Sequence, residues 1–167
     1  MAKRIVSITT MTPTATADTT NLVDATYPFL VQGGSSTQRV NILEVYLGGQ
    51  AGSSAPTFML LARDSTVAAT NSNGTGQTDA SLDASTAALA APALVGNTNT
   101  TKPQRSSTLH LLNLSFNAFG GIVRWVAAPG EEINVIGNTA SLGEVSLSAF
   151  TGGTPGLLGA HLIYEPF

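Results

Sequence analysis

Apolar and polar side chains alternate along several segments of this chain with a period of two. That period is typical of β-strands that bury one face, because successive side chains on a strand point to opposite sides. Residues 39–47 form the strongest such segment in the N-terminal half. The side chains expected to face inward are Leu43, Val45 and Leu47, with Glu44 and Tyr46 facing the other way.

Three C-terminal segments carry the same alternation and predict strands with one buried face. In the first, Leu112, Leu114 and Phe116 should lie on the same face of the strand. The second, residues 143–149, should point Val145 and Leu147 inward and Glu144, Ser146 and Ser148 outward. The third, residues 159–165, should place Ala160, Leu162 and Tyr164 on one face and His161, Ile163 and Glu165 on the other.

Three further strands are predicted nearer the N-terminus. Arg4–Thr10 is the first. Ala25–Gln32 is the second, and Pro28 assigns it to the edge of a sheet, because proline cannot donate to the ladder. Thr57–Arg63 is apolar on both faces, which indicates a central strand or one buried in a contact.

A Pro-Gly dipeptide interrupts the alternating stretch of residues 119–138. Proline presets φ for the first central position of a tight turn, and glycine can take positive φ at the second. Apolar residues alternate on both sides of Pro129 and Gly130, namely Val123 and Trp125 before them and Ile133 and Val135 after them. We therefore predict a β-hairpin around this turn.

Two segments lack this pattern. Residues 1–24 continue from their first strand into a threonine-rich stretch and are predicted as an extended N-terminal arm. Residues 65–107 are predicted as a long loop insertion, a length that usually indicates a functional or disordered segment. Within it, Asp83–Ala91 predicts a short helix capped by Ser81 or Asp83. We expect one or both segments to become ordered on a neighbouring subunit by strand addition.

Together these segments give about nine strands separated by Gly/Pro turns, with little helix, which predicts a sandwich or barrel. We expect one all-β domain over residues 1–167, a single antiparallel β-sandwich of jelly-roll type. Its inner faces should hold Leu43, Val45, Leu47, Leu112, Leu114, Val123, Trp125, Ile133, Val135, Val145, Leu147 and Leu162.

Composition narrows the classes of function. Charged residues make up 10% of the chain, well below the roughly 25% of an ordinary soluble domain. So little charge gives weak repulsion between copies, and we expect a homo-oligomer, a trimer, with a two-fold dimer as the alternative. The net charge of −3 and the scattered arginines do not favour nucleic-acid binding. No apolar run is long enough to span a membrane, and the absence of cysteine excludes disulfides.

The sequence predicts no catalytic or metal-binding pattern. Serines are abundant, but no GxSxG elbow accompanies His110 or His161, which are expected on half-exposed strands. Glu131 and Glu132 are adjacent and would point to opposite faces, so they cannot form a glycosidase pair with each other; Glu131 is expected near Arg124.

Two weaker patterns also predict no site. Asn71, Asn73 and Asp79 carry oxygen ligands but lack the calcium-loop pattern, and Gly74 and Gly76 have no strand-to-helix context for phosphate. Trp125 is expected in the core or in an interface rather than beneath a sugar or base. We therefore expect no catalytic residue, cofactor or metal, and no enzyme.

Four stretches of the sequence resemble small β-sandwich structural proteins of tailed bacteriophages. They are RVNILEVYLGG, PTFMLLARDST, FNAFGGIVRWVAAPGEEINVIGN and LGAHLIYE. The resemblance implies a late hairpin around Pro129 and a final strand over Ala160–Glu165 that closes the domain. The long loop insertion and the threonine-rich arm depart from the family pattern.

The jelly-roll members of that family include decoration, or cement, proteins of phage heads. The resemblance therefore implies a virion protein on the outer surface of the capsid, with the major capsid protein as its partner. The alternative is a fibre, neck or tail module that recognises a host-surface glycan or another virion protein. The low aromatic content, 6% of residues with Trp125 as the single tryptophan, favours the capsid role, because sugar-binding surfaces usually present aromatic side chains.

Overall fold

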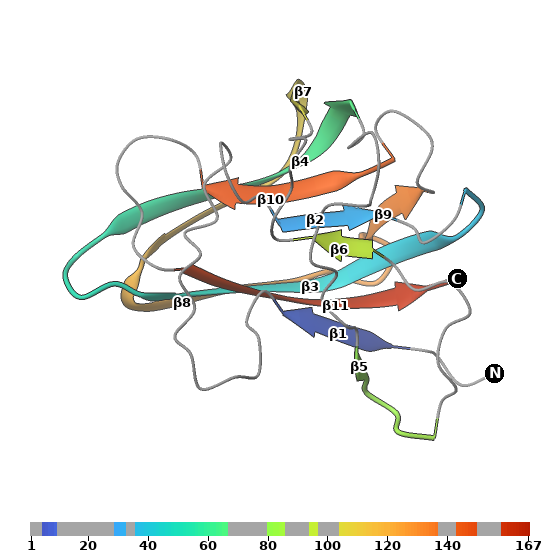
Figure 1. The fold of residues 1–167 in the computed structure, drawn as a ribbon, viewed down its shortest axis with the longest axis horizontal. Helices are drawn as coiled ribbons and strands as arrows, with labels where there is room; N and C mark the ends of the chain where they lie inside the picture. The colour runs from blue at the N-terminus through green and yellow to red at the C-terminus, as the bar shows by residue number, and fades with distance from the viewer. Residues whose placement is uncertain are drawn as a thin grey trace.

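The computed structural model is all-β and antiparallel throughout the residues that it describes, and none of them is helical. These are residues 5–9, 29–32, 36–66, 80–85, 94–96, 104–136, 143–149 and 158–167. Their strands form two sheets packed on a shared core, which confirms the expected all-β sandwich (Figure 1).

Sheet A has the strand order β5-β1-β11-β3-β8, and β9 also pairs with β3. Its strands are β1 (Val6–Thr9), β3 (Arg39–Gln50), β5 (Ala80–Ser81), β8 (Phe119–Val126), β9 (Ile133–Ile136) and β11 (Leu158–Pro166). The longest pairing within sheet A joins β11 to β3, from Leu158 opposite Gly49 to Pro166 opposite Val40. Two backbone hydrogen bonds of 3.0 Å between Arg39 and Phe167 extend this pairing to the last residue.

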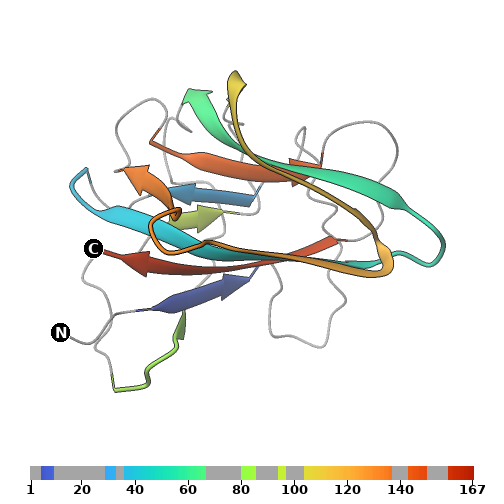
Figure 2. The same ribbon diagram turned by 180° about the vertical axis from the view of Figure 1, so that it is seen from behind.

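Sheet B has the strand order β6-β2-β10-β4-β7. Its strands are β2 (Phe29–Gln32), β4 (Pro56–Thr66), β6 (Leu94–Gly96), β7 (Gln104–Asn117) and β10 (Val145–Ala149). β4 lies between β10 and β7, and it is buried on both faces over most of its length, as its apolar sequence predicts. Seen from behind, β7 follows β4 and β8 follows β3 along the sandwich (Figure 2).

The core lies between the two sheets and contains nearly all the predicted side chains. Of these, six are fully buried: Val45, Leu47, Val135, Val145, Leu147 and Leu162. Five more are partly buried against the core: Leu112, Leu114, Val123, Trp125 and Ile133. Arg63 also links the sheets, because its Nη2 donates to the Asn134 carbonyl on β9 at 2.9 Å.

Leu43 does not face inward as predicted, because β3 carries a bulge there. Glu44 pairs with Ile163 on β11, and Ile42 pairs with the next residue, Tyr164, so Leu43 is an extra residue without a partner position. A bulge shifts the alternation by one residue. Accordingly the buried positions change from Val40 and Ile42 to Val45 and Leu47, and Leu43 is half-buried.

The predicted hairpin over residues 119–138 is wrong, although its turn is present. Glu131 N–H donates to the Ala128 carbonyl at 2.8 Å, and Gly130 has φ of 88°, so Pro129 and Gly130 occupy the expected turn positions. However, β8 and β9 each pair antiparallel with β3, one after the other. β8 and β9 therefore run in the same direction along β3. The turn lies in the loop between them and does not reverse the direction of the chain.

Other boundaries differ from those predicted. β2 lies between β10 and β6 rather than at an edge. Residues 6–9 form β1 within sheet A, which confirms the strand predicted over Arg4–Thr10. The predicted loop 65–107 contains the end of β4, β5, β6 and the start of β7. Asp83–Ser85, the described part of the predicted helix, is a turn in which Asp83 Oδ1 accepts from Ser85 N–H at 2.9 Å. The rest of the arm, loop and helix lies outside the described residues.

Candidate functional site: the outer face and open edge of sheet A

A row of polar and aromatic side chains crosses the outer face of sheet A. Arg124 on β8 is directly opposite Tyr46 on β3, and Tyr46 is opposite His161 on β11. The Arg124 guanidinium carbon lies 5.0 Å from the centre of the Tyr46 ring. The Tyr46 and His161 rings meet edge to face, with centroids 5.6 Å apart. The sequence alternation had placed Tyr46 and His161 on outward faces, and the sheet brings them together.

Glu44 is the anionic partner in this row. Its Oε2 accepts hydrogen bonds from Arg124 Nη2 at 2.7 Å and from Nε at 3.0 Å. Arg124 does not pair with Glu131 as predicted, because β8 is aligned along β3 and delivers Arg124 beside Glu44. The pair balances these two charges and keeps the guanidinium over the Tyr46 ring on β3.

The shifted pKa values in the row follow from these contacts. Burial alone would raise the pKa of Glu44, but hydrogen bonds from Tyr46 and Arg124, with the arginine charge, lower it. The hydrogen bond to Glu44 raises the pKa of Tyr46, and the same carboxylate raises the pKa of Arg124. Burial lowers the pKa of His161, opposed by the Glu44 charge. The carboxylate of Glu44 is thus the centre of the cluster.

Apolar side chains line the outer margin of sheet A beside this row. Ile122 is 79% exposed and Val126 is 50% exposed on β8, on either side of Arg124. Phe119, at the start of β8, and Ile136, at the end of β9, are exposed too. Among the described strands β8 has a partner on one side only. We call its other side, which faces away from β3, the open edge.

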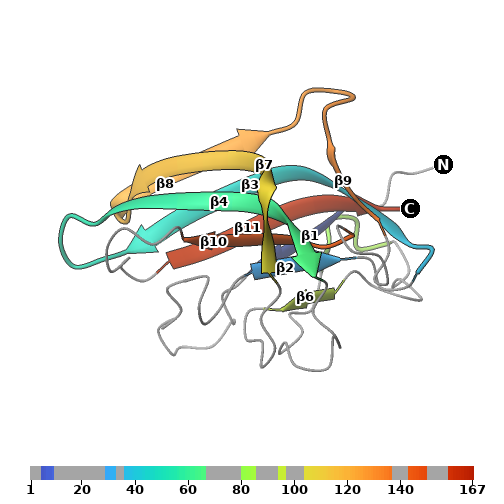
Figure 3. The same ribbon diagram turned by 90° about the horizontal axis from the view of Figure 1, so that it is seen from above.

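The corner between β7 and β8 holds β8 at this margin. Asn117 Oδ1 accepts hydrogen bonds from the N–H groups of Ala55 and Phe119, at 2.9 and 3.0 Å. Ala118 is buried, and it exchanges backbone hydrogen bonds with Ala51 and Ala55. A Cβ on Gly49 would collide with the backbone of Ala118, so glycine is required for this close approach. Figure 3 shows β7 and β8 meeting at the edge of the sandwich.

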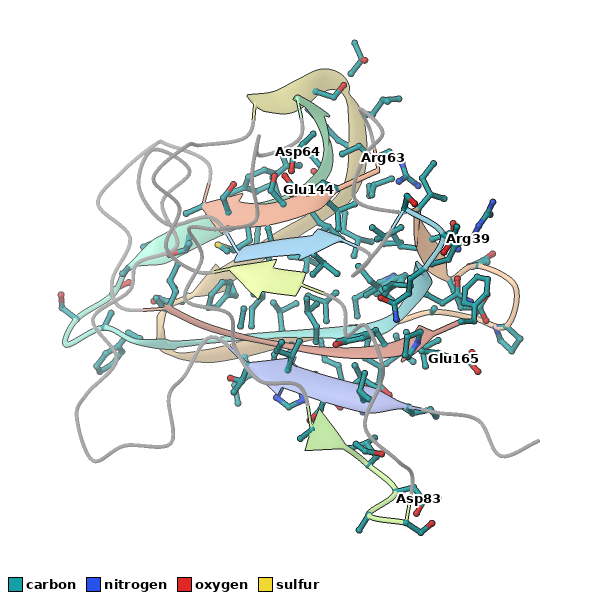
Figure 4. All side chains as sticks on the ribbon, turned by 45° about the vertical axis from the view of Figure 1, so that its right-hand side comes forward. Arg39, Arg63, Asp64, Asp83, Glu144 and Glu165 are labelled. Atoms are coloured by element: carbon teal, nitrogen blue, oxygen red, sulfur yellow. The ribbon has the colours of Figure 1, made fainter. Side chains whose placement is uncertain are left out.

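Sheet B presents a different polar cluster, which is buried. Asp64 on β4 and Glu144 beside β10 are both 0% exposed, and Figure 4 shows their side chains close together. Ser146 Oγ donates to Asp64 Oδ1 at 2.7 Å, and Asp64 N–H donates to the Glu144 carbonyl at 3.1 Å. Sequence alternation had placed Glu144 and Ser146 on the outer face of the sheet, and this assignment is correct. It did not indicate that side chains on this face are buried. Asp64 was not singled out at all.

The remaining candidates of the sequence are separate from one another. His110 is exposed on β7, and Trp125 packs partly buried against the core. Glu131 is exposed in the loop after β8, and Glu132 Oε1 accepts from Gly130 N–H at 3.2 Å. Asn71, Asn73, Asp79 and the glycines at 74 and 76 lie outside the described residues.

The described residues lack two features that would indicate a particular class of site. They contain no cluster of three or more histidine, cysteine, aspartate and glutamate side chains that could hold a metal ion. They also contain no helix of the length and apolarity needed to cross a bilayer.

Comparison of the chain with family models, with curated proteins and with solved structures finds no match.

Proposed function

We propose that this chain is a structural virion protein of a tailed bacteriophage. In this proposal it binds the major capsid protein on the outer surface of the head, as a decoration or cement protein in many copies. The proposal rests on the resemblance of four sequence stretches to phage sandwich proteins, and the strand order of the two sheets supports it.

The strand order favours the jelly-roll type. β5 and β6 are short additions of two and three residues, and β8 and β9 follow one another along β3. With these set aside or combined, eight strands remain in the described part of the chain. We number these strands from first to eighth in chain order. Their spatial order is then first, eighth, third and sixth across sheet A, and second, seventh, fourth and fifth across sheet B. This interleaving of two Greek keys is the arrangement of double-sheet jelly rolls, which occur in viral capsid domains and also in lectins and cupins.

The stretches that carry the resemblance are neighbours in space. Three of them correspond to β3, β8 with β9, and β11, which are adjacent in sheet A. The fourth corresponds to β4, which is central in sheet B. The resemblance therefore covers one connected part of the sandwich, including the outer face and open edge described above.

A cement role has a simple physical basis. Each copy that bridges two shell subunits adds an interface that must break before the shell opens. Bridging also makes single contacts multivalent, which raises avidity by roughly 10²–10⁴ without new kinds of contact. A chain with 10% charged residues desolvates few ions in such an interface, so its binding should depend weakly on salt.

The test is to remove this protein from purified particles and to heat the stripped and decorated forms in parallel. The expected result is release of the genome at a lower temperature from the stripped shell, and recovery of the original temperature when the purified protein is added back. Equal release temperatures would contradict the cement role.

The number of copies per particle separates this role from the alternative. Hundreds of copies spread over the head are expected for a decoration protein. A handful at one vertex or on the tail would replace it with the fibre, neck or tail module. Tyr46 does not favour a glycan platform, because Arg124 already covers its ring.

A further inference from the structure

The open edge of β8 presents backbone groups that another strand can use. Ala127 N–H donates to the Leu43 carbonyl at 2.9 Å, and the register then pairs Trp125 with Val45 and Val123 with Leu47. In an antiparallel pair, residues alternate between bonding to the partner strand and pointing away from it. The backbone groups of Ile122, Arg124 and Val126 therefore point away from β3, toward the open edge.

The side chains along this edge have a pattern that reads alike in both directions. On the outer face Ile122 and Val126 are exposed on either side of Arg124. On the inner face Val123 and Trp125, the neighbours of Arg124, are half-buried. The order is therefore apolar, apolar, arginine, aromatic, apolar.

Arg124 does not disturb this symmetry, because its charge is directed away from the edge. Its guanidinium lies over the Tyr46 ring on β3 and bonds to Glu44 on the same strand. The ion pair is neutral as a unit. Two copies can therefore bring their Arg124 backbones together without placing two uncompensated charges side by side.

We propose that the open edge is occupied by β8 of a second copy of this chain, antiparallel, with a two-fold axis at Arg124. In this register Ile122 of each copy is opposite Val126 of the other on the outer face. On the inner face Val123 is opposite Trp125 of the other copy. The outward-pointing backbone groups of Ile122, Arg124 and Val126 become paired, and sheet A continues across the dimer.

Neighbouring registers fit less well. Moving the axis to Val123 places Ile122 opposite Arg124 of the other copy, and it leaves Trp125 opposite Gly121. Moving it to Trp125 places Arg124 opposite Val126 and Val123 opposite Ala127. Only the axis at Arg124 matches apolar with apolar residues on both faces. Lysine, other charged residues and proline commonly protect an edge strand from pairing. This edge carries neither lysine nor proline, and its one charged residue, Arg124, is paired with Glu44 on β3.

This inference selects the two-fold dimer, the alternative to the trimer expected from the sequence. It does not rest on the capsid role, because it concerns the purified chain. A failure of the dimer leaves the particle-heating experiment unaffected, and a failure of the cement role leaves the dimer unaffected.

The chain contains no cysteine, so single cysteines can report the register without background. In the full chain, R124C places the two introduced thiols at the axis, about 5.5 Å apart between Cα atoms, within disulfide range. We expect a covalent dimer on mild oxidation. I122C alone should not cross-link, because its two copies are roughly 13 Å apart along the strands. An I122C protein mixed with a V126C protein should cross-link as a mixed dimer.

S115C, on an exposed position of β7, is the matched control. Equal cross-linking of R124C and S115C would overturn the proposal, as would efficient cross-linking of I122C alone. The mixture of I122C and V126C keeps the test decisive if R124C folds poorly, because both proteins retain Arg124. Absence of the mixed dimer would then overturn the register.

Light scattering of the unmodified chain gives an independent test. We expect a dimer at micromolar concentration. In I122K the dissociation constant of the dimer should rise roughly tenfold or more, because a lysine disfavours edge pairing. L82K changes an equally apolar exposed residue in the turn after β5 and should leave the dimer unchanged. A monomer or a trimer for the unmodified chain at high micromolar concentration would overturn the proposal.

Discussion

The outer faces of the two sheets reverse the usual distribution of side chains. On sheet B, polar residues of the outer face are buried, among them Asp64, Ser146 and Ser148. On sheet A, apolar residues Ile122 and Val126 are exposed. β10 alternates apolar and polar residues in the ordinary way, whereas β8 carries apolar residues on both faces around Arg124. Alternation therefore indicates which face of a sheet a residue belongs to, while the exposure of that residue depends on what covers the face.

The two arrangements carry different energetic consequences. A buried polar group must be hydrogen-bonded or its burial destabilises the fold, and the Ser146 hydroxyl meets this requirement by donating to Asp64 Oδ1. An exposed apolar residue costs the fold little, but it makes burial against a partner favourable. Changes on β10 should therefore alter folding, whereas changes at the edge of β8 should alter association. Four predictions test this contrast.

The largest effect is expected between two apolar truncations. Leu147 on β10 is fully buried, so Leu147→Ala removes packed methyl groups and leaves a cavity. We expect a loss of about 2–5 kcal/mol in the free energy of unfolding, measured by urea denaturation. Ile122→Ala at the open edge should change the stability of the monomer by less than about 0.5 kcal/mol. Equal losses would show that the open edge is covered within one chain.

The next effect concerns the corner that holds β8 at the edge. A Cβ on Gly49 would collide with the backbone of Ala118, whereas one on Gly48 meets nothing within 4 Å. Gly49→Ala should therefore cost about 1–3 kcal/mol, because backbone must move to make room. Gly48→Ala is the matched control and should be near neutral in the same denaturation experiment. Similar effects of the two substitutions would contradict the close approach.

The buried polar contact of sheet B should give a smaller loss. Ser146→Ala removes the hydroxyl that donates to Asp64 Oδ1, and we expect about 1 kcal/mol of destabilisation. Ser115→Ala on the exposed face of β7 provides the comparison and should change stability very little. A neutral result for Ser146→Ala would indicate that water reaches this face of the sheet.

The sequence predicted local features well and long-range partners poorly. Alternation assigned the correct faces of β10 and β11, and turn chemistry placed Pro129 and Gly130 correctly, because both depend on adjacent residues. Which strand pairs with which depends on the whole sheet. The hairpin prediction is wrong for this reason, because β8 and β9 both pair with β3 and not with each other.

The candidate site shows the same limit. Glu131 was expected to contact Arg124 because it is near in sequence, whereas the observed partner, Glu44, is 80 residues away. The bulge at Leu43 leaves no local signal, because a leucine fits either face of a strand. The burial of Glu144 was likewise not predictable, because the alternation in residues 143–149 places it at an ordinary outward position.

The smallest effect concerns the ion pair that keeps Arg124 over β3. The pKa of Glu44 is lowered because the hydrogen bonds from Tyr46 and Arg124, with the arginine charge, outweigh the effect of burial. A carboxylate with a lowered folded-state pKa stabilises the fold above its unfolded pKa, and this contribution is lost as the pH falls through the folded value. In R124Q the pKa of Glu44 should rise, as followed by NMR titration of its side chain. The control substitution R39Q changes an exposed arginine at the start of β3 and should leave the pKa of Glu44 unchanged. An unshifted Glu44 in R124Q would mean that the pair does not persist in solution, and Arg124 would then project its charge across the open edge and oppose the pairing of two copies.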